Sequence, residues 1–345
     1  MPIYTLGLEG SANKLGVAVL CDDIILSNVR HTFVAPTGSG FRPPEVTQHH
    51  RSHILALLRE ALHIAHVRMA EINIIAYTRG PGLGGPLAAV LLVAKTLAVR
   101  FGIPIQAVNH CVAHAEMGRH VLGVNRAVVL YASGGNTQVL GLENGRYRIF
   151  GEAIDVAVGN CLDRVARDLG ISNDPAPGLN IELLARKFAH KQHILDVPIP
   201  IKGMDVSCSG INSYMRTHFE KLSMAWPEFI TSQEELVQYF CYSLQENLFA
   251  ALVEITERVC AHLRSQNVLC VGGVGCNERL QEMLAIMCQE RGGSIGGMDE
   301  RYCIDNGAMI GLVGYLQETN GVGRVDVAAA DVVQRWRTDS VEIKW

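Results

Sequence analysis

The sequence predicts an α/β protein of two similar halves that face each other across a nucleotide-binding cleft. The first observation is a repeat: a strand, a Gly/Ser/Asn turn and two further strands occur near residues 3–29 and again at 127–150. The second is an apolar strand at 267–271 that ends in a glycine turn, Gly272–Gly275, and leads into a helix, as in α/β nucleotide sites. The third is composition, because 48% hydrophobic residues in a chain of 345 allow a large core.

The repeat has the same order of elements in both copies. The first has a turn at Glu9–Lys14, and the second has one at Ser133–Asn136 followed by an Asn144-Gly145 hairpin turn. Either turn alone is equally consistent with an ordinary hairpin, because Gly, Ser and Asn are general turn formers. The repeat predicts two domains, 1–126 and 127–345, with the C-terminal helix and tail free to pack back on the first. The predicted strands are 3–8, 16–21, 24–29, 127–131, 137–142 and 147–150.

The remaining elements follow from hydrophobic periodicity and from helix start signals. Ser232 and Glu235 are spaced as a capping box at the start of the longest predicted helix. Pro86 suits the first turn of another helix. We expect helices at 47–66, 87–101, 157–169 and 231–264, a helix that contains Glu182, one after Asn277 and one that starts at Asp305, and strands at 72–77, 103–108 and 267–271.

A helix after the strand 103–108 carries His110 and His114. Residues four apart lie on one helix face, so both imidazoles can reach one ion. The glycines of the Ser133–Asn136 turn would let backbone N–H groups approach a phosphate. Together they suggest one site for a metal and a nucleotide. His63 and His66 are expected on the surface, whereas the role of His49 and His50 stays open.

Composition and charge limit the possible functions. The net charge is −4, with 30 basic against 34 acidic residues, whereas a protein that binds nucleic acid alone is usually more basic. The ten cysteines include no CxxC pair and indicate reduced thiols in a cytosolic or nuclear protein. No signal or transit peptide is visible. Lys95 and Arg100 interrupt the most apolar region, 86–105, which argues against a membrane span.

Several motifs occur in order along the chain, at residues 8–14, 110–114, 131–138, 159–164, 172–175, 272–277, 303–308 and 334–339. Taken together, they closely resemble the tRNA N6-adenosine threonylcarbamoyltransferase family, the catalytic subunit of the KEOPS complex. The resemblance covers almost the whole chain and is nearest to the eukaryotic cytosolic branch. It implies the two-domain actin/hexokinase/Hsp70-like (ASKHA) fold with a nucleotide cleft between duplicated halves.

The resemblance also implies site residues. Two nitrogens, a phenol and a carboxylate would bind one divalent metal, and ligand type alone does not choose between iron, zinc and magnesium. No residue stands out as a catalytic base. The implied metal ligands are His110, His114, Tyr131 and Asp305. The implied nucleotide-binding residues are Tyr131, Ala132, Ser133, Gly134, Gly135, Asp163, Gly178, Glu182 and Asn277.

The implied reaction transfers a threonylcarbamoyl group from threonylcarbamoyl-AMP to N6 of adenosine 37 in tRNAs that read ANN codons. The implied partners are tRNA and the KEOPS subunits, an atypical small kinase/ATPase and a small dimerising subunit. We expect the kinase on an exposed apolar helix face of the first half. One alternative is a metal- and ATP-binding scaffold without catalysis. A metal-dependent glycoprotease is less favoured, because Cys111 stands where an HExxH site needs glutamate.

Overall fold

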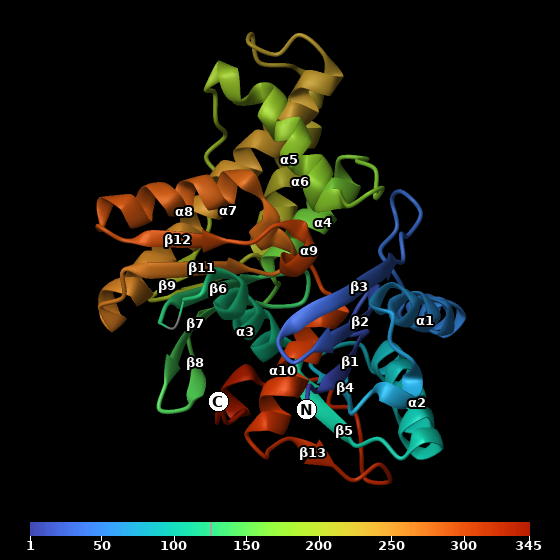
Figure 1. Ribbon diagram of the computed structural model, residues 1–345. Coiled ribbons are helices and arrows are strands. Elements are labelled where there is room, and N and C mark those ends of the chain that lie inside the picture. The colour runs from blue at the N-terminus through green and yellow to red at the C-terminus, as the bar shows by residue number, and fades with distance from the viewer. Residues whose placement is uncertain (125) are drawn as a thin grey trace.

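The computed structural model describes residues 1–124 and 126–345 and contains two large β-sheets with helices around them, and a small two-stranded sheet (Figure 1). The first sheet has the strand order β13-β5-β4-β1-β2-β3. β1 pairs antiparallel with β2 and parallel with β4, so the predicted meander continues into a parallel region. The strands are β1 (Tyr4–Glu9), β2 (Lys14–Cys21), β3 (Ile24–Thr32), β4 (Ile74–Gly80), β5 (Ile105–Asn109) and β13 (Arg324–Val325).

The second sheet repeats this topology, with the order β12-β11-β6-β7-β8 in place of β5-β4-β1-β2-β3. β6 is antiparallel to β7 and parallel to β11. Asn144 and Gly145, at φ 50° and 68°, form the predicted hairpin turn. The repeat in the sequence is therefore a repeat of sheet topology. The strands are β6 (Val128–Ala132), β7 (Thr137–Glu143), β8 (Arg146–Glu152), β11 (Asn267–Val271) and β12 (Ser294–Gly297), and β9 (Ile201–Lys202) pairs with β10 (Asp205–Val206).

Helices cover the outer faces of both sheets. In the first half, α1 packs on β2 and β3, and α2 packs on β4 and α1. In the second half, α4 to α8 form a larger helical layer, in which α7 contacts α5, α6 and α8 (Figure 1). The helices are α1 (Pro43–Ala65), α2 (Gly84–Phe101), α3 (His110–Leu122), α4 (Val158–Asp168), α5 (Pro177–Phe188), α6 (Ser209–Met224), α7 (Gln233–Leu263), α8 (Glu278–Glu290), α9 (Glu300–Cys303) and α10 (Gly307–Thr319), with short 3-10 turns η1 (Met69–Glu71), η2 (Ala189–Lys191), η3 (Gly273–Cys276) and η4 (Thr338–Ser340).

Two helices, α3 and α10, lie between the sheets and contact each other (Figure 1). α3 belongs to the first half by sequence but packs on β11 and β6, whereas α10 belongs to the second half but packs on β1, β2, β4 and β5. A Cβ on Gly7 of β1 would lie only 2.2 Å from the carbonyl oxygen of Gly307. The backbone of α10 therefore touches the backbone of β1. The division at residue 126 stays a prediction.

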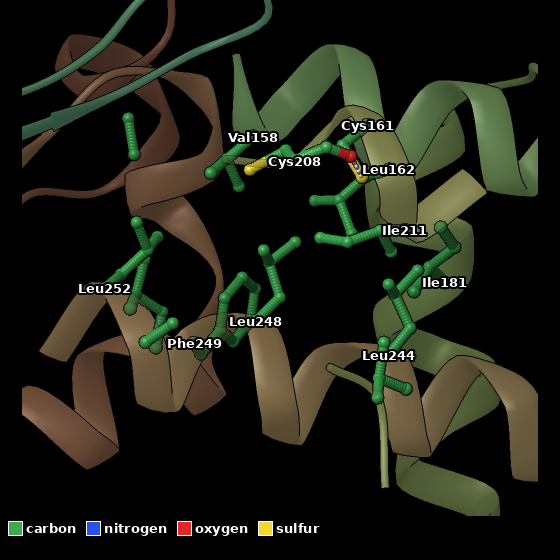
Figure 2. Packing of buried hydrophobic residues seen from close by; sticks show 14 of the residues in the cluster. Val158, Cys161, Leu162, Ile181, Cys208, Ile211, Leu244, Leu248, Phe249 and Leu252 are labelled. Atoms are coloured by element: carbon green, nitrogen blue, oxygen red, sulfur yellow. Dashed lines mark hydrogen bonds between the residues drawn. The ribbon is translucent and has the colours of Figure 1, made fainter. Parts of the chain in front are cut away.

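The core of the second half is organised around α7 (Figure 2). Leu244, Leu248 and Leu252 pack against residues of α4, α5 and α6, including Leu162, in one buried cluster. All seven apolar positions predicted along this helix are buried, which confirms its inward face. They are Leu236, Phe240, Leu244, Leu248, Leu252, Ile255 and Val259.

The start of α7 has half of the predicted capping box. Ser232 Oγ accepts a hydrogen bond from the backbone N–H of Glu235 at 3.1 Å. The Glu235 carboxylate reaches one residue further back than predicted, to the backbone N–H and the hydroxyl of Thr231 at 2.7 and 2.8 Å. The side chains of Ser232 and Glu235 therefore still accept hydrogen bonds from donor groups near the start of the helix.

Other boundaries differ from the prediction for local reasons. α1 begins at Pro43, because proline fits the first helical turn, whereas we expected a start at Thr47. α10 begins at Gly307 after the N-cap Asn306, so Asp305 lies just before the helix. Helix α6 was not predicted at all.

α2 is, among the described residues, the one helix long and apolar enough to cross a membrane by length and composition. Its buried residues Leu87, Val90 and Ala94 belong to the packed side of the helix, which contacts β4 and α1. Leu92 and Val99 on its outer side are 63% and 75% exposed. The helix thus has one core face and one exposed apolar face.

The contact between α10 and β1 predicts a severe effect of Gly7→Ala. The added methyl group meets backbone atoms of α10 that cannot move alone, so we expect the free energy of unfolding to fall by about 1–3 kcal/mol or more. Urea unfolding followed by circular dichroism measures this change. Gly210→Ala in α6 is the control, because a Cβ there meets no atom within 4 Å. Equal stability of Gly7→Ala and the control would contradict the close packing.

Candidate functional site

The candidate site begins where β5 passes directly into α3. Asn109, the last residue of β5, caps α3 by accepting hydrogen bonds from the backbone N–H groups of Cys111 and Val112 at 3.0 and 3.1 Å. This fixes the first turn of the helix and, with it, His110 and His114. Both histidines are buried, and their ring centroids are 4.8 Å apart. The predicted one-face arrangement of the two imidazoles is therefore present.

Asp305 reaches these histidines from the opposite half of the protein. Its Oδ1 lies 3.1 Å from Nε2 of His114 and 3.5 Å from Nε2 of His110. The packing of α10 on β1 and β2 holds this residue in place, since Asn306 caps α10 through a hydrogen bond from the backbone N–H of Met309. The ring of Tyr131, at the end of β6, is centred 5.0 Å from the ring of His114. The structure thus brings together all four predicted metal ligands.

Glu9 is a residue of this site that the sequence analysis missed. It ends β1, is fully buried, and its carboxylate lies 3.2 Å from Nδ1 of His110. It also accepts hydrogen bonds from Ser11 N and Oγ, at 2.7 and 2.6 Å, and from the hydroxyl of Thr78. A carboxylate on one nitrogen of a ligand histidine fixes the ring so that the other nitrogen faces the metal. The signal in the sequence was an acidic residue that ends an otherwise apolar strand.

Electrostatics keeps the carboxylates of Glu9 and Asp305 ionised beside His110. Burial alone would raise the pKa of Glu9, but the imidazole of His110 outweighs burial and lowers it. Burial alone would lower the pKa of His110, and the carboxylate of Glu9 raises it instead. Burial likewise works against ionised Asp305, yet Lys14 and the two histidines hold its pKa well below the usual range. Lys14 Nζ lies 3.9 Å from Oδ2 of Asp305, which leaves Oδ1 to the histidines.

The donor set fits a metal ion. His110, His114 and Asp305 each offer a ligand atom, and these atoms lie within 4.8 Å of one another. Burial lowers the pKa of His114, which favours the neutral imidazole that binds metals. Burial raises the pKa of Tyr131 well above its usual value, so its phenol is neutral unless a cation lies beside it. Imidazole and carboxylate ligands suit several divalent transition metals.

The turn between β6 and β7 lies at the carboxyl end of β6. Its shape is fixed by hydrogen bonds between Ser133 and Asn136, from Ser133 N to the Asn136 carbonyl at 2.9 Å and from Asn136 N to Ser133 Oγ at 3.1 Å. Gly134 and Gly135 are exposed, and a Cβ on either would meet no described atom within 4 Å. Their backbone is therefore open to a ligand, as the prediction requires.

The start of α4 packs directly against this turn. The backbone N–H of Gly159 donates to the Ser133 carbonyl at 3.1 Å, and a Cβ on Gly159 would lie 2.7 Å from that oxygen. Asp163 lies one turn further along α4. Burial raises the pKa of Asp163, while Lys14 and Arg167 act in the opposite direction. The charge of Lys14, which pairs with Asp305, therefore also acts on Asp163 and opposes the rise in its pKa.

Glu182 and Asn277 meet at a different place, the start of α8. Glu182 Oε1 accepts the backbone N–H of Glu278 at 3.0 Å, and the Asn277 side chain caps α8 through Arg279 N and Leu280 N at 3.0 and 3.2 Å. Both are buried. Gly178, the second residue of α5, has open space beside it. In the part of the chain that the structure describes, no hydrogen bond joins Glu182 to the Ser133–Asn136 turn, so their shared role in nucleotide binding stays a prediction.

Ala132 and Gly272 lie between the Ser133–Asn136 turn and the Asn277 end of α8, which are the two groups of predicted nucleotide-binding residues. A Cβ on Gly272, at the end of β11, would lie 2.4 Å from the carbonyl oxygen of Ala132. The neighbouring ends of the parallel strands β6 and β11 therefore place the turn and Asn277 at one sheet edge. That edge is where open α/β sheets bind ligands.

His110→Ala and His114→Ala should each lose the bound metal while the fold is kept. Each variant removes one nitrogen ligand, and α3 tolerates alanine. We expect the metal content, measured by mass spectrometry of purified protein, to fall by about one ion per chain relative to the wild type. His120→Ala, an exposed change on the same helix, is the control. Stoichiometric metal at this centre in both variants would remove these histidines from the ligand set.

Comparisons with known proteins assign the chain to one family. The family model described as tRNA N6-adenosine threonylcarbamoyltransferase matches residues 24–312. A protein of that name from Chaetomium globosum is 52% identical over 344 residues, covering 99% of this chain and 96% of the relative. The protein of that name from Homo sapiens is 51% identical over 340 residues, covering 99% and 98%.

Solved structures support the fold. HypF of T. kodakarensis superposes with a TM-score of 0.59 at 17% identity over 93% of this chain and 49% of its own. The activator of 2-hydroxyisocaproyl-CoA dehydratase from Clostridium difficile, with bound ADPNP, gives 0.51 at 12% identity over 94% and 100%. The actin/hexokinase/Hsp70-like fold is thereby confirmed. By its sequence matches over nearly its whole length, the chain belongs to the tRNA N6-adenosine threonylcarbamoyltransferase family.

Proposed function

We propose that this protein transfers the threonylcarbamoyl group from threonylcarbamoyl-AMP to N6 of adenosine 37 in tRNAs that read ANN codons. The observation that carries the proposal is the convergence of His110, His114 and Asp305 near Tyr131 and its open glycine turn, in a chain of this family. The relatives named for this activity match the chain over nearly their full length.

In this proposal, His110, His114, Tyr131 and Asp305 hold one divalent metal ion. The two imidazoles favour iron or zinc over magnesium, which prefers oxygen ligands. When bound, the ion supplies Lewis-acid polarisation of the carbamoyl carbonyl and orients the threonyl group. Glu9 holds Nδ1 of His110 so that Nε2 faces Asp305.

The turn Ser133–Asn136 holds the nucleotide phosphate in this proposal, through backbone N–H groups at Gly134 and Gly135. The N6 lone pair attacks the carbamoyl carbon, and the bond from that carbon to the phosphate oxygen breaks. AMP leaves with the electron pair. The proton lost from N6 passes to the departing phosphate, since a phosphate monoester with a second pKa of about 6 is a base at neutral pH.

Two other functions explain the site less well. A glycoprotease needs a general base, but Cys111 follows His110, and Glu116 accepts hydrogen bonds from Arg119, Tyr147 and Trp345. The Glu116 carboxylate is therefore already engaged. A metal- and ATP-binding scaffold would need the same ligands, so turnover is the measurement that separates it from the enzyme.

The proposal includes protein partners and a location. The outer faces of α1 and α2 expose Leu55, Ile64, Leu92 and Val99, which support docking of a KEOPS-type kinase/ATPase on this helical part. A small dimerising subunit completes the proposed assembly. We propose a cytosolic and nuclear location, which the ten free cysteines support, since reduced thiols are typical of these compartments.

Asp163→Asn and Glu182→Gln should each weaken binding of an adenine nucleotide by about 1–3 kcal/mol, because each removes a carboxylate acceptor. The glutamine side chain keeps an oxygen that can accept the hydrogen bond from Glu278 N at the start of α8. A change in nucleotide affinity is then not caused by loss of this cap. Calorimetry with AMP measures the affinity. Asp168→Asn on the exposed side of α4 is the control. Unchanged affinity in both site variants would exclude these residues from the nucleotide site.

The isolated chain should bind tRNA weakly and modify it slowly or not at all. Phosphate contacts from Lys and Arg dominate nucleic-acid affinity, and this chain has 30 such residues against 34 acidic ones. Filter binding at near-physiological salt, with and without the partner subunits, tests this expectation. Sub-micromolar binding and turnover by the chain alone would contradict both the charge argument and the need for partners.

A further inference from the structure

A second histidine cluster lies outside the candidate site, on the first sheet and α1. His31 belongs to β3, and His49 and His53 are one turn apart on α1, which packs on that strand. One ring nitrogen from each lies within 4.8 Å of the others. We propose that His31, His49 and His53 form a second metal site, which binds a divalent transition-metal ion of the zinc class.

The three imidazole rings lie close enough together to share one ion. His31 Nδ1 lies 2.6 Å from Nε2 of His49, so these two nitrogens face each other. The ring of His53 is centred 3.9 Å from that of His31 and 4.6 Å from that of His49. Zinc binds imidazole at about 2.0–2.1 Å in a tetrahedron, which places ligand nitrogens roughly 3.3 Å apart. The facing nitrogens need to separate by less than about 1 Å to admit the ion.

The chemical environment suits a cation bound by neutral donors. Burial, together with His50, His53 and His31, lowers the pKa of His49 to about 4. Burial and His53 also lower the pKa of His31. Neutral imidazoles need lose no proton to bind a metal. Among the described residues, no salt bridge joins any of the three histidines to a carboxylate.

Two further features favour a site over a packing cluster. Nδ1 of His53 is buried and, within residues 1–124 and 126–345, has no hydrogen-bond partner, so this imidazole has a polar atom that the surrounding side chains do not satisfy. His31 is exposed while His49 and His53 are partly buried, so solvent can reach the cluster. Three histidines then leave the fourth position of the ion to water.

The proposed metal site would also hold His50 against the turn that follows β1, close to the candidate functional site. Nδ1 of His49 lies 3.1 Å from Nδ1 of the neighbouring His50, which is fully buried. A Cβ on Gly10 would lie 3.0 Å from His50, so His50 packs under the turn that follows β1. That turn carries Ser11, which bonds Glu9 beside His110. A metal that ties α1 to β3 therefore holds His50 against this turn.

The test uses the full chain, stripped of metal with a chelator and titrated with Zn²⁺ against a chromophoric competitor, and with Co²⁺ followed by visible absorption. The variant His31→Gln/His53→Gln should bind one ion fewer per chain than the wild type. The double variant His63→Gln/His66→Gln is the matched control, because both residues are exposed at the other end of α1, and it should keep the wild-type stoichiometry.

A second background separates this site from the candidate centre. The variant His110→Ala/His114→Ala should still bind one Zn²⁺, lose it when His31→Gln is added, and melt at a higher temperature with Zn²⁺ than without. His31 is exposed, so its single replacement spares the fold and gives a readable result in the native background too. Equal Zn²⁺ stoichiometry with and without His31 and His53 would overturn the proposal.

Discussion

The close contact of α10 with β1 and β2 is the constraint on which the candidate site depends. Gly7 and Gly307 allow the helix backbone to lie directly on the strand, and a Cβ on Gly311 would lie 2.4 Å from Leu20. Because α10 packs so closely on the first sheet, Asp305, which lies just before this helix, is held beside the histidines of α3. The metal ligands therefore depend on packing between two elements that carry no ligand themselves. These glycines therefore matter for the metal ligands, because they let α10 and the first sheet approach each other closely.

Local signals in the sequence predicted most elements of the fold. Strand alternation, the Asn144-Gly145 turn and the apolar face of α7 depend on neighbours within a few residues, and these elements were found. Helix α6 was missed, and the Glu235 cap reached Thr231 in place of Ser232. Several cap geometries satisfy the same donors, so the sequence does not choose between them.

The site was harder to predict, because its residues meet across long stretches of chain. The His114–Asp305 contact spans 191 residues, and the His110–Glu9 contact spans 101. Spacing predicted the histidine pair, since i and i+4 are local. Asp305 and Tyr131 came from the resemblance, and Glu9, whose role depends on its partner, was not found. Glu182 and Asn277 also show that a predicted ligand-binding residue can be a helix cap. With the Glu182 carboxylate at the start of α8, that helix already has an anion there, which leaves the glycine turn as the better place for a phosphate.

The exchange of α3 and α10 between the halves has a consequence for synthesis on the ribosome. β1 is made first, but the helix that covers its inner face follows about 300 residues later. At about 5–20 residues per second, the first sheet waits roughly 15–60 seconds with an apolar surface uncovered. The nascent chain therefore presents a long-lived binding surface for chaperones. The two halves complete their cores only together, after the end of α10 has left the exit tunnel.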